Sequence, residues 1–381
     1  MPQADELIST QTAETLTRQL AAITGSHMPA LTAASRAFDG LSLRERSDHL
    51  RDALLEDIPG DYEQLAAVIR AAAESAEFTG WLIWPVTSAV AARARTEATH
   101  QAFADALHLL AELTHRLTAE FAIRALLRHD LDAALSIITE WTTSPDEHVR
   151  RLASEGTRPY LPWAVRIPQL TKQPGITIPI LNTLYKDKSE YVRRSVANHL
   201  NDLSRDIPDV VVETARSWLA DPDETTPWVV RHGLRTLIKK GHPSALELLG
   251  FGPAEIEVSG PYLERTEVPW GGALTFRAEL HNTGEEPAQL AIDYVIHHRK
   301  ANGTTTAKTF KLTTGVLGPG ECLSVQRKHS FRMITTRRYY PGAHAVALQI
   351  NGIATEQRSF ELLPEERGRP PLDDLITAAS S

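Results

Sequence analysis

Three acidic side chains fall in segments that are predicted to be helical, where they could supply negative charge to a reaction. They are Glu120 in "RLTAEFAIR", Glu155 in "EHVRRLASEGTRPYLPWA" and Asp202 in "EYVRRSVANHLNDL". Trp163 follows Glu155 after a short segment that contains prolines. The face of an aromatic ring attracts a cation, and carboxylates stabilise positive charge as it develops. The pattern therefore indicates a pocket that could hold a cationic ring and support a reaction that builds up positive charge.

Asp202 belongs to a helix face that is unusual for one that meets only water. In a helix over residues 188–205, one face would be apolar, formed by Val192, Val196, Leu200 and Leu203. The nearly opposite face would be polar, formed by Arg194, Asn198, Asn201, Asp202 and Arg205. Asn and Asp are poor helix formers, whereas exposed faces usually carry Lys, Glu, Gln or Ala. The composition favours a face that binds something, and an ordinary solvated face is the alternative.

The other residues also have simpler interpretations. Glu120 could be a surface charge, and Trp163 could be a packing residue behind a proline turn. Arg193 and Arg194 could cap helices or form salt bridges between neighbouring repeats. Taken one at a time, these residues do not decide between a site and a structural role.

The predicted helices recur along the sequence. The segments "EHVRRLASEG", "EYVRRSVANH" and "WVVRHGLRTL" align on a Val-Arg pair, which places Val149, Val192 and Val230 at spacings of 43 and 38 residues. Such a period is typical of HEAT-like helical pairs, which stack into a curved solenoid with a concave binding face. Apolar residues at helical spacing continue through most of residues 1–252. We therefore predict a mainly α protein whose first domain is a HEAT-like helical-repeat solenoid over residues 1–252.

The pattern changes after residue 252. Residues 256–362 contain about seven short alternating segments, and "KANGTT" and "INGIA" carry the Asn-Gly signal of tight hairpins. This pattern predicts a C-terminal immunoglobulin-like β-sandwich. Residues 363–381 are rich in Pro, Asp, Glu and Ser, and we expect them to form a disordered tail.

Composition restricts the classes of function. The chain has 381 residues, a net charge of −8 and a single cysteine, Cys322. The negative charge is concentrated in residues 1–149, whereas residues 150–250 and 256–360 are mildly basic, which permits a local anion-binding surface. We find no secretory signal, no membrane-spanning stretch, no HExxH motif and no nucleotide-binding GxxxxGK[ST] loop. A cytoplasmic protein without metal or other cofactor is expected.

Four motifs, taken together, resemble a known family. "SEYVRRSVANHLNDLSRDIPD", "LTAEFAIR", "SEGTRPYLPW" and "WVVRHGLRTLIKKGHP" are similar to bacterial DNA alkylation repair glycosylases of the HEAT-like-repeat superfamily, most of all to the AlkC branch. The resemblance extends over residues 15–362, because the β-segment resembles the Ig-like domain of one AlkC subgroup. It implies hydrolysis of the N-glycosidic bond of cationic alkylated bases, chiefly 3-methyladenine and 3-methylcytosine, to leave an abasic site in base excision repair.

The resemblance also implies roles for individual residues. Glu120 and Asp202 match the catalytic carboxylates, Glu155 a further acidic residue of the pocket, and Trp163 an aromatic wall. A larger set of residues matches groups that bind DNA: Arg151, Arg158, Arg193, Arg194, Asn198, Arg231, Arg235, Lys239, Arg299 and Lys300. Further DNA contacts are expected from the basic groups His298, Arg337 and Arg338 of the second domain, with a solvated hairpin as the alternative.

The expected partner is double-stranded DNA that contains alkylated bases. The protein would act as a monomer in the bacterial cytoplasm and associate with the nucleoid when bound to DNA. Two other functions remain compatible with the sequence: a lesion-binding protein without catalysis, and a helical-repeat scaffold that binds a protein. DNA binding should weaken steeply as salt increases, and the scaffold hypothesis predicts no such decline.

Overall fold

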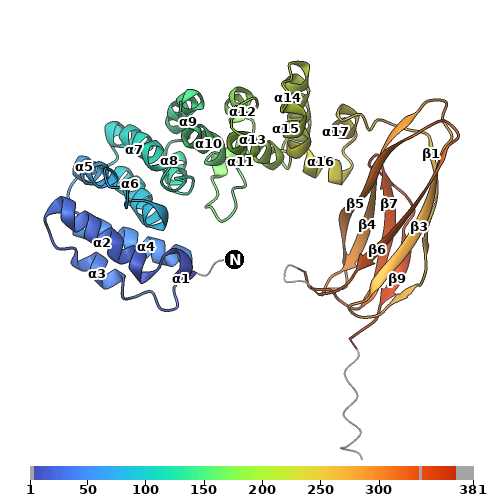
Figure 1. Cartoon of the computed structure of the whole chain (residues 1–381), viewed down its shortest axis with the longest axis horizontal. Helices are drawn as coiled ribbons and strands as arrows, with labels where there is room; N and C mark the ends of the chain where they lie inside the picture. The colour runs from blue at the N-terminus through green and yellow to red at the C-terminus, as the bar shows by residue number, and fades with distance from the viewer. Residues whose placement is uncertain (1–3, 334–336, 366–381) are drawn as a thin grey trace, which may run out of the picture. The chain divides into compact units, whose positions relative to one another are not determined.

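The computed structural model describes residues 4–333 and 337–365 of the chain. It divides into two compact units, Met1–Leu234 and Arg235–Ser381, both drawn in Figure 1. The last two helices, which the sequence analysis assigns to the repeat domain, group with the β-strands in this division. Most of the predicted tail, from residue 366 onward, lies outside the described residues.

The first unit is helical, as predicted. Its elements are α1 (Ala4–Leu7), α2 (Thr10–Thr24), α3 (Pro29–Ala34), α4 (Leu43–Asp57), α5 (Tyr62–Ala73), η1 (Gly80–Leu82), α6 (Ile83–Glu97), α7 (His100–Leu113), α8 (Ile123–His129), α9 (Leu131–Glu140), η2 (Trp141–Thr143), α10 (Glu147–Glu155), α11 (Pro168–Lys172), α12 (Ile178–Leu184), α13 (Glu190–Leu203), α14 (Pro208–Ala220) and α15 (Thr226–Gly233). Local signals set many of these limits. Ser42 and Glu45 form a capping box at α4, and Asp61, Thr99 and Asp130 accept backbone N–H bonds at the starts of α5, α7 and α9.

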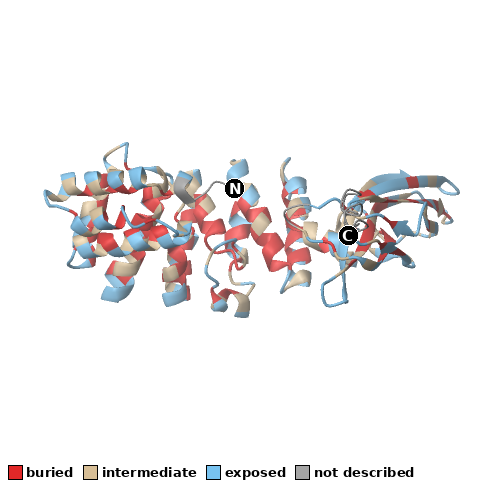
Figure 2. Cartoon of the chain, turned by 90° about the horizontal axis from the view of Figure 1, so that it is seen from below, coloured by how far each residue is buried: buried red, intermediate tan, exposed pale blue. Residues whose placement is uncertain are grey.

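The helices are arranged in two rows. In the inner row α4 packs against α6 and α6 against α8, and further along α10 packs against α13 and α13 against α15. In the outer row α2 packs against α5, α5 against α7, α7 against α9, and α12 against α14. Figure 1 shows the two rows following an arc within this unit. Figure 2 shows the buried residues running through these helices, as expected when each pair buries its apolar face against the next.

The recurring Val-Arg motif has a structural explanation in the first two of its repeats. Val149 opens the motif in α10, and the following Arg150 donates to Asp187 from Nε at 2.6 Å and from Nη2 at 3.0 Å. Asp187 also accepts the backbone N–H of Ser189 at the start of α13. Arg193, the equivalent of Arg150, donates to the carbonyl oxygen of Asp187 at 2.6 Å. Arg150 therefore joins consecutive repeats, whereas Arg193 binds the turn before its own helix, which agrees with the helix-capping alternative for Arg193.

One predicted helix is interrupted, and the interruption matters for the site. The sequence pattern predicts helix through "LTAEFAIR", but α7 ends at Leu113 and α8 begins at Ile123, so Glu120 lies in the turn between them. Threonine hydroxyls satisfy the backbone there. Oγ1 of Thr114 accepts the N–H of Ala119 at 3.2 Å, and Oγ1 of Thr118 accepts that of Glu120 at 3.4 Å. Such local bonds compete with the helix, which explains the wrong prediction.

The second unit is a β-sandwich preceded by two short helices. Its elements are α16 (Arg235–Lys240), α17 (Pro243–Leu248), β1 (Ile256–Leu263), β2 (Glu267–Val268), β3 (Ala273–Asn282), β4 (Ala288–Arg299), β5 (Thr305–Leu317), β6 (Cys322–Ser330), β7 (Gly342–Ile350), β8 (Ile353–Ala354) and β9 (Arg358–Leu362). One sheet has the order β1-β3-β6, and the other has the order β2-β9-β7-β4-β5 with β8 paired to β7. The predicted fold class, a helical-repeat solenoid followed by an immunoglobulin-like sandwich, is confirmed.

Seven of the twelve residues of strand β4 are buried, because both of its faces are covered. The sandwich core covers one face, and Leu246 and Phe251 pack against Ala291 on the other. The turn after α16 meets the β7–β8 turn, where Gly241 and Gly352 approach each other. A Cβ on Gly241 would lie 2.6 Å from the carbonyl oxygen of Gly352, so no side chain fits there. The helices α16 and α17 therefore pack as part of this unit.

No helix among residues 4–333 and 337–365 is long and apolar enough to cross a membrane.

The strand predictions hold for the two Asn-Gly hairpins. The "KANGTT" segment connects β4 to β5, and in "INGIA" both Asn351 and Gly352 have positive φ, at 45° and 85°. Two positive φ values in succession are those of a type I′ turn.

Candidate active site

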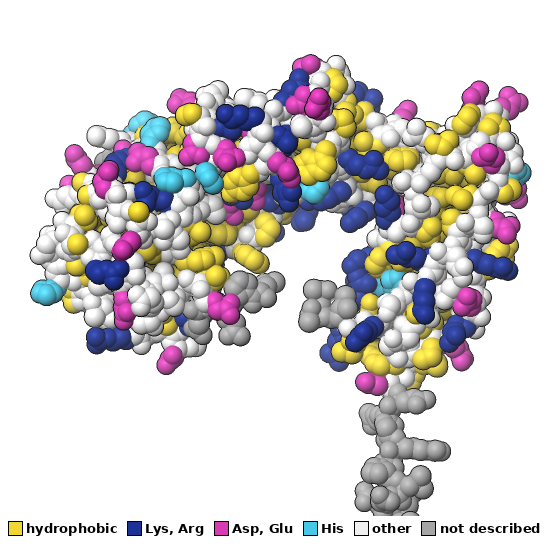
Figure 3. All heavy atoms as spheres, in the orientation of Figure 1, with side chains coloured by type: hydrophobic (Ala, Val, Ile, Leu, Met, Phe, Trp, Pro, Cys, Tyr) yellow, Lys and Arg dark blue, Asp and Glu magenta, His cyan; other side chains and the backbone are white. Residues whose placement is uncertain are grey.

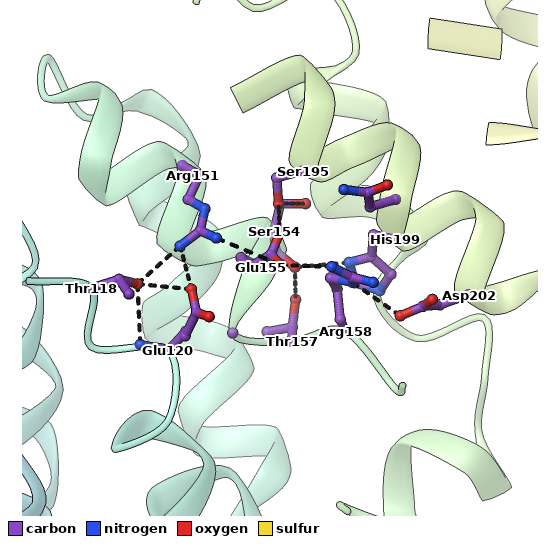
Figure 4. Close-up of polar contacts among 12 residues, drawn as sticks. Thr118, Glu120, Arg151, Ser154, Glu155, Thr157, Arg158, Ser195, His199 and Asp202 are labelled. Carbon is purple, nitrogen blue, oxygen red and sulfur yellow. Dashed lines mark hydrogen bonds and ion pairs between the residues drawn. The ribbon is translucent and has the colours of Figure 1, made fainter. Parts of the chain in front are cut away.

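The three predicted carboxylates come from separate elements of the first unit and converge. Glu120 lies in the turn before α8, Glu155 ends α10, and Asp202 lies in the last turn of α13. All three residues are buried, with exposed fractions of 8%, 6% and 3%. Figure 4 shows Arg151 and Arg158 among them. We call these five residues, Glu120, Arg151, Glu155, Arg158 and Asp202, the carboxylate–guanidinium network.

Arg158 links two of the carboxylates. Its Nε donates to Oδ2 of Asp202 at 2.9 Å, and its Nη1 donates to Oε1 of Glu155 at 2.6 Å. Burial lowers the pKa of Arg158, but the bond to Asp202 and the charges of Glu155 and Asp202 outweigh it, so the pKa lies above its ordinary value. A guanidinium presents its donors in fixed directions. The charged Arg158 therefore holds both carboxylates in one orientation.

Arg151 links the third carboxylate to the same cluster. Its Nη1 contacts Oε2 of Glu120 and donates to Oγ1 of Thr118 at 2.9 Å. The Thr118 hydroxyl donates in turn to Oε2 of Glu120 at 2.9 Å. On the other side, Nη2 of Arg151 lies 3.5 Å from Oε1 of Glu155. The ring of Tyr191 lies beside this guanidinium, 5.0 Å from its Cζ.

The three carboxylates differ in which of their oxygens have protein partners. Both oxygens of Glu155 are bonded, because Oε1 accepts from Arg158 and Oε2 accepts from Ser195 at 2.7 Å. In Glu120 and Asp202 the protein donors converge on a single oxygen, Oε2 and Oδ2 respectively. Within the described residues, Oε1 of Glu120 and Oδ1 of Asp202 accept no protein hydrogen bond. Glu120 and Asp202 thus each have an oxygen that can bind another molecule.

A neutral histidine, His199, joins the two helices that carry Glu155 and Asp202. Nδ1 of His199 lies 2.9 Å from the carbonyl oxygen of Ser154, which can only accept, so Nδ1 carries the hydrogen. Nε2 then accepts from the hydroxyl of Thr177 at 3.0 Å. Burial lowers the pKa of His199 to about 3, and the positive charge of Arg158 adds to this effect. His199 is therefore neutral at neutral pH and joins α10 to α13.

The carboxylates of the network can face a cationic guest. Their three negative charges are balanced by the two guanidinium groups of the network and by Arg124, which is buried beside it, in surroundings from which water is largely excluded. Charges interact more strongly there than in bulk water. Fixed negative groups of this kind can stabilise positive charge that develops in a reaction. Among the described residues, no group of three or more His, Cys, Asp or Glu side chains is placed to hold a metal ion.

Trp163 lies in the segment 156–167 between α10 and α11, and its side chain is exposed. The exposed fraction of the residue is 77%, so the indole does not pack in the core. Its φ is +59°, a backbone conformation that costs energy in any residue other than glycine. Nη2 of Arg44 donates to its carbonyl oxygen. Strained backbone conformations of this kind cluster at functional sites.

A basic pocket adjoins the network. It has a volume of about 450 Å³ and is lined by side chains of α4, α6 and α8, of the turn before α8, and by Val165. Its wall includes Trp84 and Phe121, whose rings are stacked with centroids 5.1 Å apart. Four of its lining residues are arginines: Arg44, Arg51, Arg95 and Arg128. None of the five network residues lines this pocket, but its lining residue Phe121 directly follows Glu120 in the chain.

The other basic residues predicted in the first unit are distributed unevenly. Arg151 and Arg158 belong to the network, and Arg193 binds the backbone carbonyl of Asp187 in the turn before its own helix. Arg194 and Arg231 are exposed, and Arg194 forms an ion pair with Glu190. Oδ1 of Asn198 lies 3.2 Å from Nε2 of His232. Figure 3 shows Lys and Arg side chains gathered near α13 and α15 of this unit.

The basic residues predicted in the second unit lie on its helix α16 and on the β4–β5 hairpin. Lys239 and Lys300 are exposed, and Arg235 and Arg299 are partly buried. His298 is buried in an aromatic cluster, and burial lowers its pKa to about 3. His298 is therefore neutral and enclosed, which contradicts the prediction that it is a basic contact residue.

The sequence analysis missed several residues that shape the site. Ser195 binds Glu155, and it occupies the position where the sister repeat has Leu152. A hydroxyl at a core position of a repeat was the signal that could have identified it. Arg124, a charge within the apolar run "AIRALL", is fully buried beside the network. Thr118 had no recognisable signal, because its role depends on the turn before α8.

Known proteins share the architecture of this chain. A family model described as the C-terminal Ig-like domain of the uncharacterised protein YhaZ matches residues 257–364. An uncharacterised protein of Bacillus subtilis (strain 168), YhaZ, is 33% identical over 323 residues, which cover 84% of this chain and 88% of that protein. A solved structure of Pseudomonas fluorescens alkylpurine DNA glycosylase AlkC, bound to DNA containing an abasic site analog, is 34% identical. The structural match covers 95% of this chain and 100% of the AlkC chain, with a TM-score of 0.84.

Proposed function

The chain belongs to the family of AlkC and YhaZ, and we propose that it is a DNA glycosylase of alkylation repair. Its substrate would be duplex DNA that carries cationic alkylated bases, and its products a free base and an abasic site. The specific substrates that we propose are 3-methyladenine and 3-methylcytosine. The observation that supports this most directly is the carboxylate–guanidinium network, with its two carboxylates that each keep an oxygen without a partner among the described residues.

The proposed reaction breaks one bond and forms one. The bond between the sugar C1′ and the base nitrogen breaks, and its electron pair leaves with the base, which thereby loses its positive charge. The sugar becomes oxocarbenium-like, as in glycoside hydrolysis, and water adds to C1′. The proton lost by that water passes to a carboxylate. Since the alkylated base is already cationic, the reaction depends less on a general acid than on negative charge beside the sugar.

Glu120 and Asp202 fit the two roles that this reaction requires. Each has one oxygen fixed by an arginine and a second oxygen directed to no protein donor within the described residues. One carboxylate would stabilise the sugar cation, and the other would orient and deprotonate the water. Glu155 has both oxygens bonded, so we assign it to the charge of the pocket and to the position of Arg158. Trp163 would contact the cationic base or the bases next to it.

The DNA backbone would be held by exposed arginines around the network. Arg194 and Arg231 are exposed in the first unit, and Arg95 and Arg128 line the adjoining pocket with their side chains accessible. Guanidinium groups bind phosphate oxygens and position the duplex without reading its sequence. We assign Arg151 and Arg158 to the carboxylates and not to phosphates, since their guanidinium groups already bind Glu120, Glu155 and Asp202.

A base-release experiment tests the proposed function. The full chain is incubated with duplexes that contain 3-methyladenine, 3-methylcytosine or 7-methylguanine, and the released bases are identified by mass spectrometry. We expect free 3-methyladenine and 3-methylcytosine together with abasic DNA. Binding of the same duplexes is measured in parallel.

Two outcomes would contradict the proposal. Tight binding of damaged DNA without base release would indicate a lesion-binding protein. Weak DNA binding that does not decline with salt, together with no release, would indicate a protein-binding scaffold. Release of 7-methylguanine alone would support a glycosylase and exclude the specific substrates that we propose.

A further inference from the structure

Arg124 is a charged side chain in the interior of the repeat unit, and the reaction proposed above does not use it. Its exposed fraction is 0%. Its Nη1 donates to the carbonyl oxygens of Gly156 at 3.0 Å and Arg158 at 2.8 Å, and its Nε donates to that of Val165 at 2.8 Å. One guanidinium group therefore binds the segment 156–165 at both of its ends.

This segment carries side chains that matter for the site. Arg158, near its start, binds Glu155 and Asp202, and Trp163, near its end, is exposed on a strained backbone. Arg124 itself lies in the first turn of α8, four residues after Glu120. It thus joins the part of the chain that carries Glu120 to the segment whose arginine holds Asp202.

We propose that Arg124 is a positioning residue for base excision. By binding both ends of the segment 156–165, it would fix Arg158 and Trp163 relative to Glu120, without touching DNA itself. The inference rests on the proposed glycosylase function. Stability alone explains the residue poorly, because Nη2 of Arg124 is buried and makes no hydrogen bond within the described residues. An unpaired donor of this kind is costly to bury.

The chain offers a matched control, because another arginine binds a loop in the same way. Nη2 of Arg93 donates to the carbonyl oxygens of Leu55 at 3.1 Å and Ile58 at 3.0 Å, and Nη1 contacts that of Gly60. These carbonyls belong to the last turn of α4 and to its connection to α5, which carry no residue of the network. Arg93→Gln therefore removes a loop-binding arginine without disturbing the site.

The experiment compares Arg124→Gln, Arg124→Lys and Arg93→Gln with the unchanged protein. The rate of 3-methyladenine release at saturating protein, the affinity for undamaged duplex, the melting temperature and hydrogen exchange are measured. We expect Arg124→Gln to slow release by about 10²-fold, the effect of misplacing catalytic groups by about 1 Å. Its DNA affinity should be unchanged, and amides of residues 157–166 should exchange faster. Arg124→Lys keeps the charge and should recover part of the rate.

Arg93→Gln should lower the melting temperature and leave the release rate unchanged. The proposal would be wrong if Arg124→Gln released base at the normal rate. It would also be wrong if Arg124→Gln and Arg93→Gln lost equal melting temperature and showed the same fall in release rate. If Arg124→Gln does not fold, Arg124→Lys decides: a normal rate overturns the proposal, and a slow rate with normal DNA affinity supports it. Failure of the unchanged protein to release any base would refute the proposed function, whereas unchanged exchange in residues 157–166 of the variants would refute the role of Arg124.

Discussion

Nε of Arg158 lies 2.9 Å from Oδ2 of Asp202, and both side chains are buried, although 44 residues separate them in the chain. The same guanidinium binds Glu155, so a single cation determines where two carboxylates of different helices lie. Buried charges of this kind are tolerated only when they are paired, and removing one partner is strongly destabilising. The geometry of the site therefore depends on a few ion pairs, and each can be tested.

Replacing a carboxylate by its amide should separate catalysis from binding. Asp202→Asn and Glu120→Gln preserve shape but remove negative charge beside the sugar. We expect base release to slow by about 10² to 10⁴-fold, the usual contribution of a positioned acid or base. Affinity for DNA containing an abasic-site analog should be maintained, since neither carboxylate binds phosphate. Single-turnover kinetics and fluorescence anisotropy measure the two quantities.

The pH dependence of release by the two amide variants indicates which carboxylate deprotonates the water. The variant that lacks the base should lose the decline in rate at low pH, whereas the other variant should keep it. If both variants release base at the normal rate, the catalytic assignment is wrong.

Arg158→Lys should damage the site while keeping its charge. An ammonium group cannot reach Glu155 and Asp202 together in the fixed geometry of a guanidinium. We expect base release to fall by at least about tenfold and the free energy of unfolding to fall by about 1–3 kcal/mol, as when a charged group loses a hydrogen-bond partner. Urea denaturation measures the stability. The double variant Arg158→Met/Asp202→Asn should lose less free energy of unfolding than the sum of the losses in the two single variants, because neither charge is left buried without its partner.

Trp163→Gly should uncouple stability from activity. Glycine adopts the observed φ of +59° without strain, which offsets the entropy that it adds to the unfolded chain. The indole is exposed, so little packing is lost. We expect the free energy of unfolding to stay within about 1 kcal/mol of its original value, while the rate of release from damaged DNA falls. A variant that is strongly destabilised would show that the ring packs in the core after all.

His199 should make the repeat unit sensitive to acid. Its pKa is about 3 in the folded protein and near the ordinary value of 6.5 when unfolded. Between these values only the unfolded chain binds the proton, so stability is lost as pH falls below about 6.5, by up to about 1.4 kcal/mol per pH unit. Helix unfolding followed by circular dichroism at several pH values measures this. His199→Asn should be less stable at pH 7 and lose less stability on acidification; equal slopes would contradict the prediction.

Arginines of the pocket beside the network should contribute to the salt dependence of DNA binding. Each phosphate contact adds about one unit to the slope of log K against log salt concentration. We expect Arg95→Ala and Arg128→Ala each to reduce that slope by about one unit, with little effect on the release rate at saturation. Arg216→Ala on the outer helix α14, where Arg216 pairs with Glu213, is the control and should leave the slope unchanged. Equal slopes in all variants would exclude the pocket as a phosphate site.

Much of the fold could be predicted from local patterns. The spacing of Val149, Val192 and Val230 indicated the repeats, and the Asn-Gly turns indicated the hairpins, because both signals depend on residues close in sequence. The position of Glu120 could not be predicted in this way. In its turn the hydroxyl oxygens of Thr114 and Thr118 accept backbone N–H bonds, and such local bonds compete with a helix.

The sequence by itself determined which residues the site could use: carboxylates and arginines on a polar helix face, and a tryptophan after a proline-containing segment. Only the tertiary structure decided how they are paired. The sequence assigns Arg151 and Arg158 to DNA, and the fold shows that their guanidinium groups bind Glu120 and Asp202. The physical reason is that ion pairs form between residues some 30 to 45 positions apart, and their energies depend on burial and distance, which no local pattern encodes.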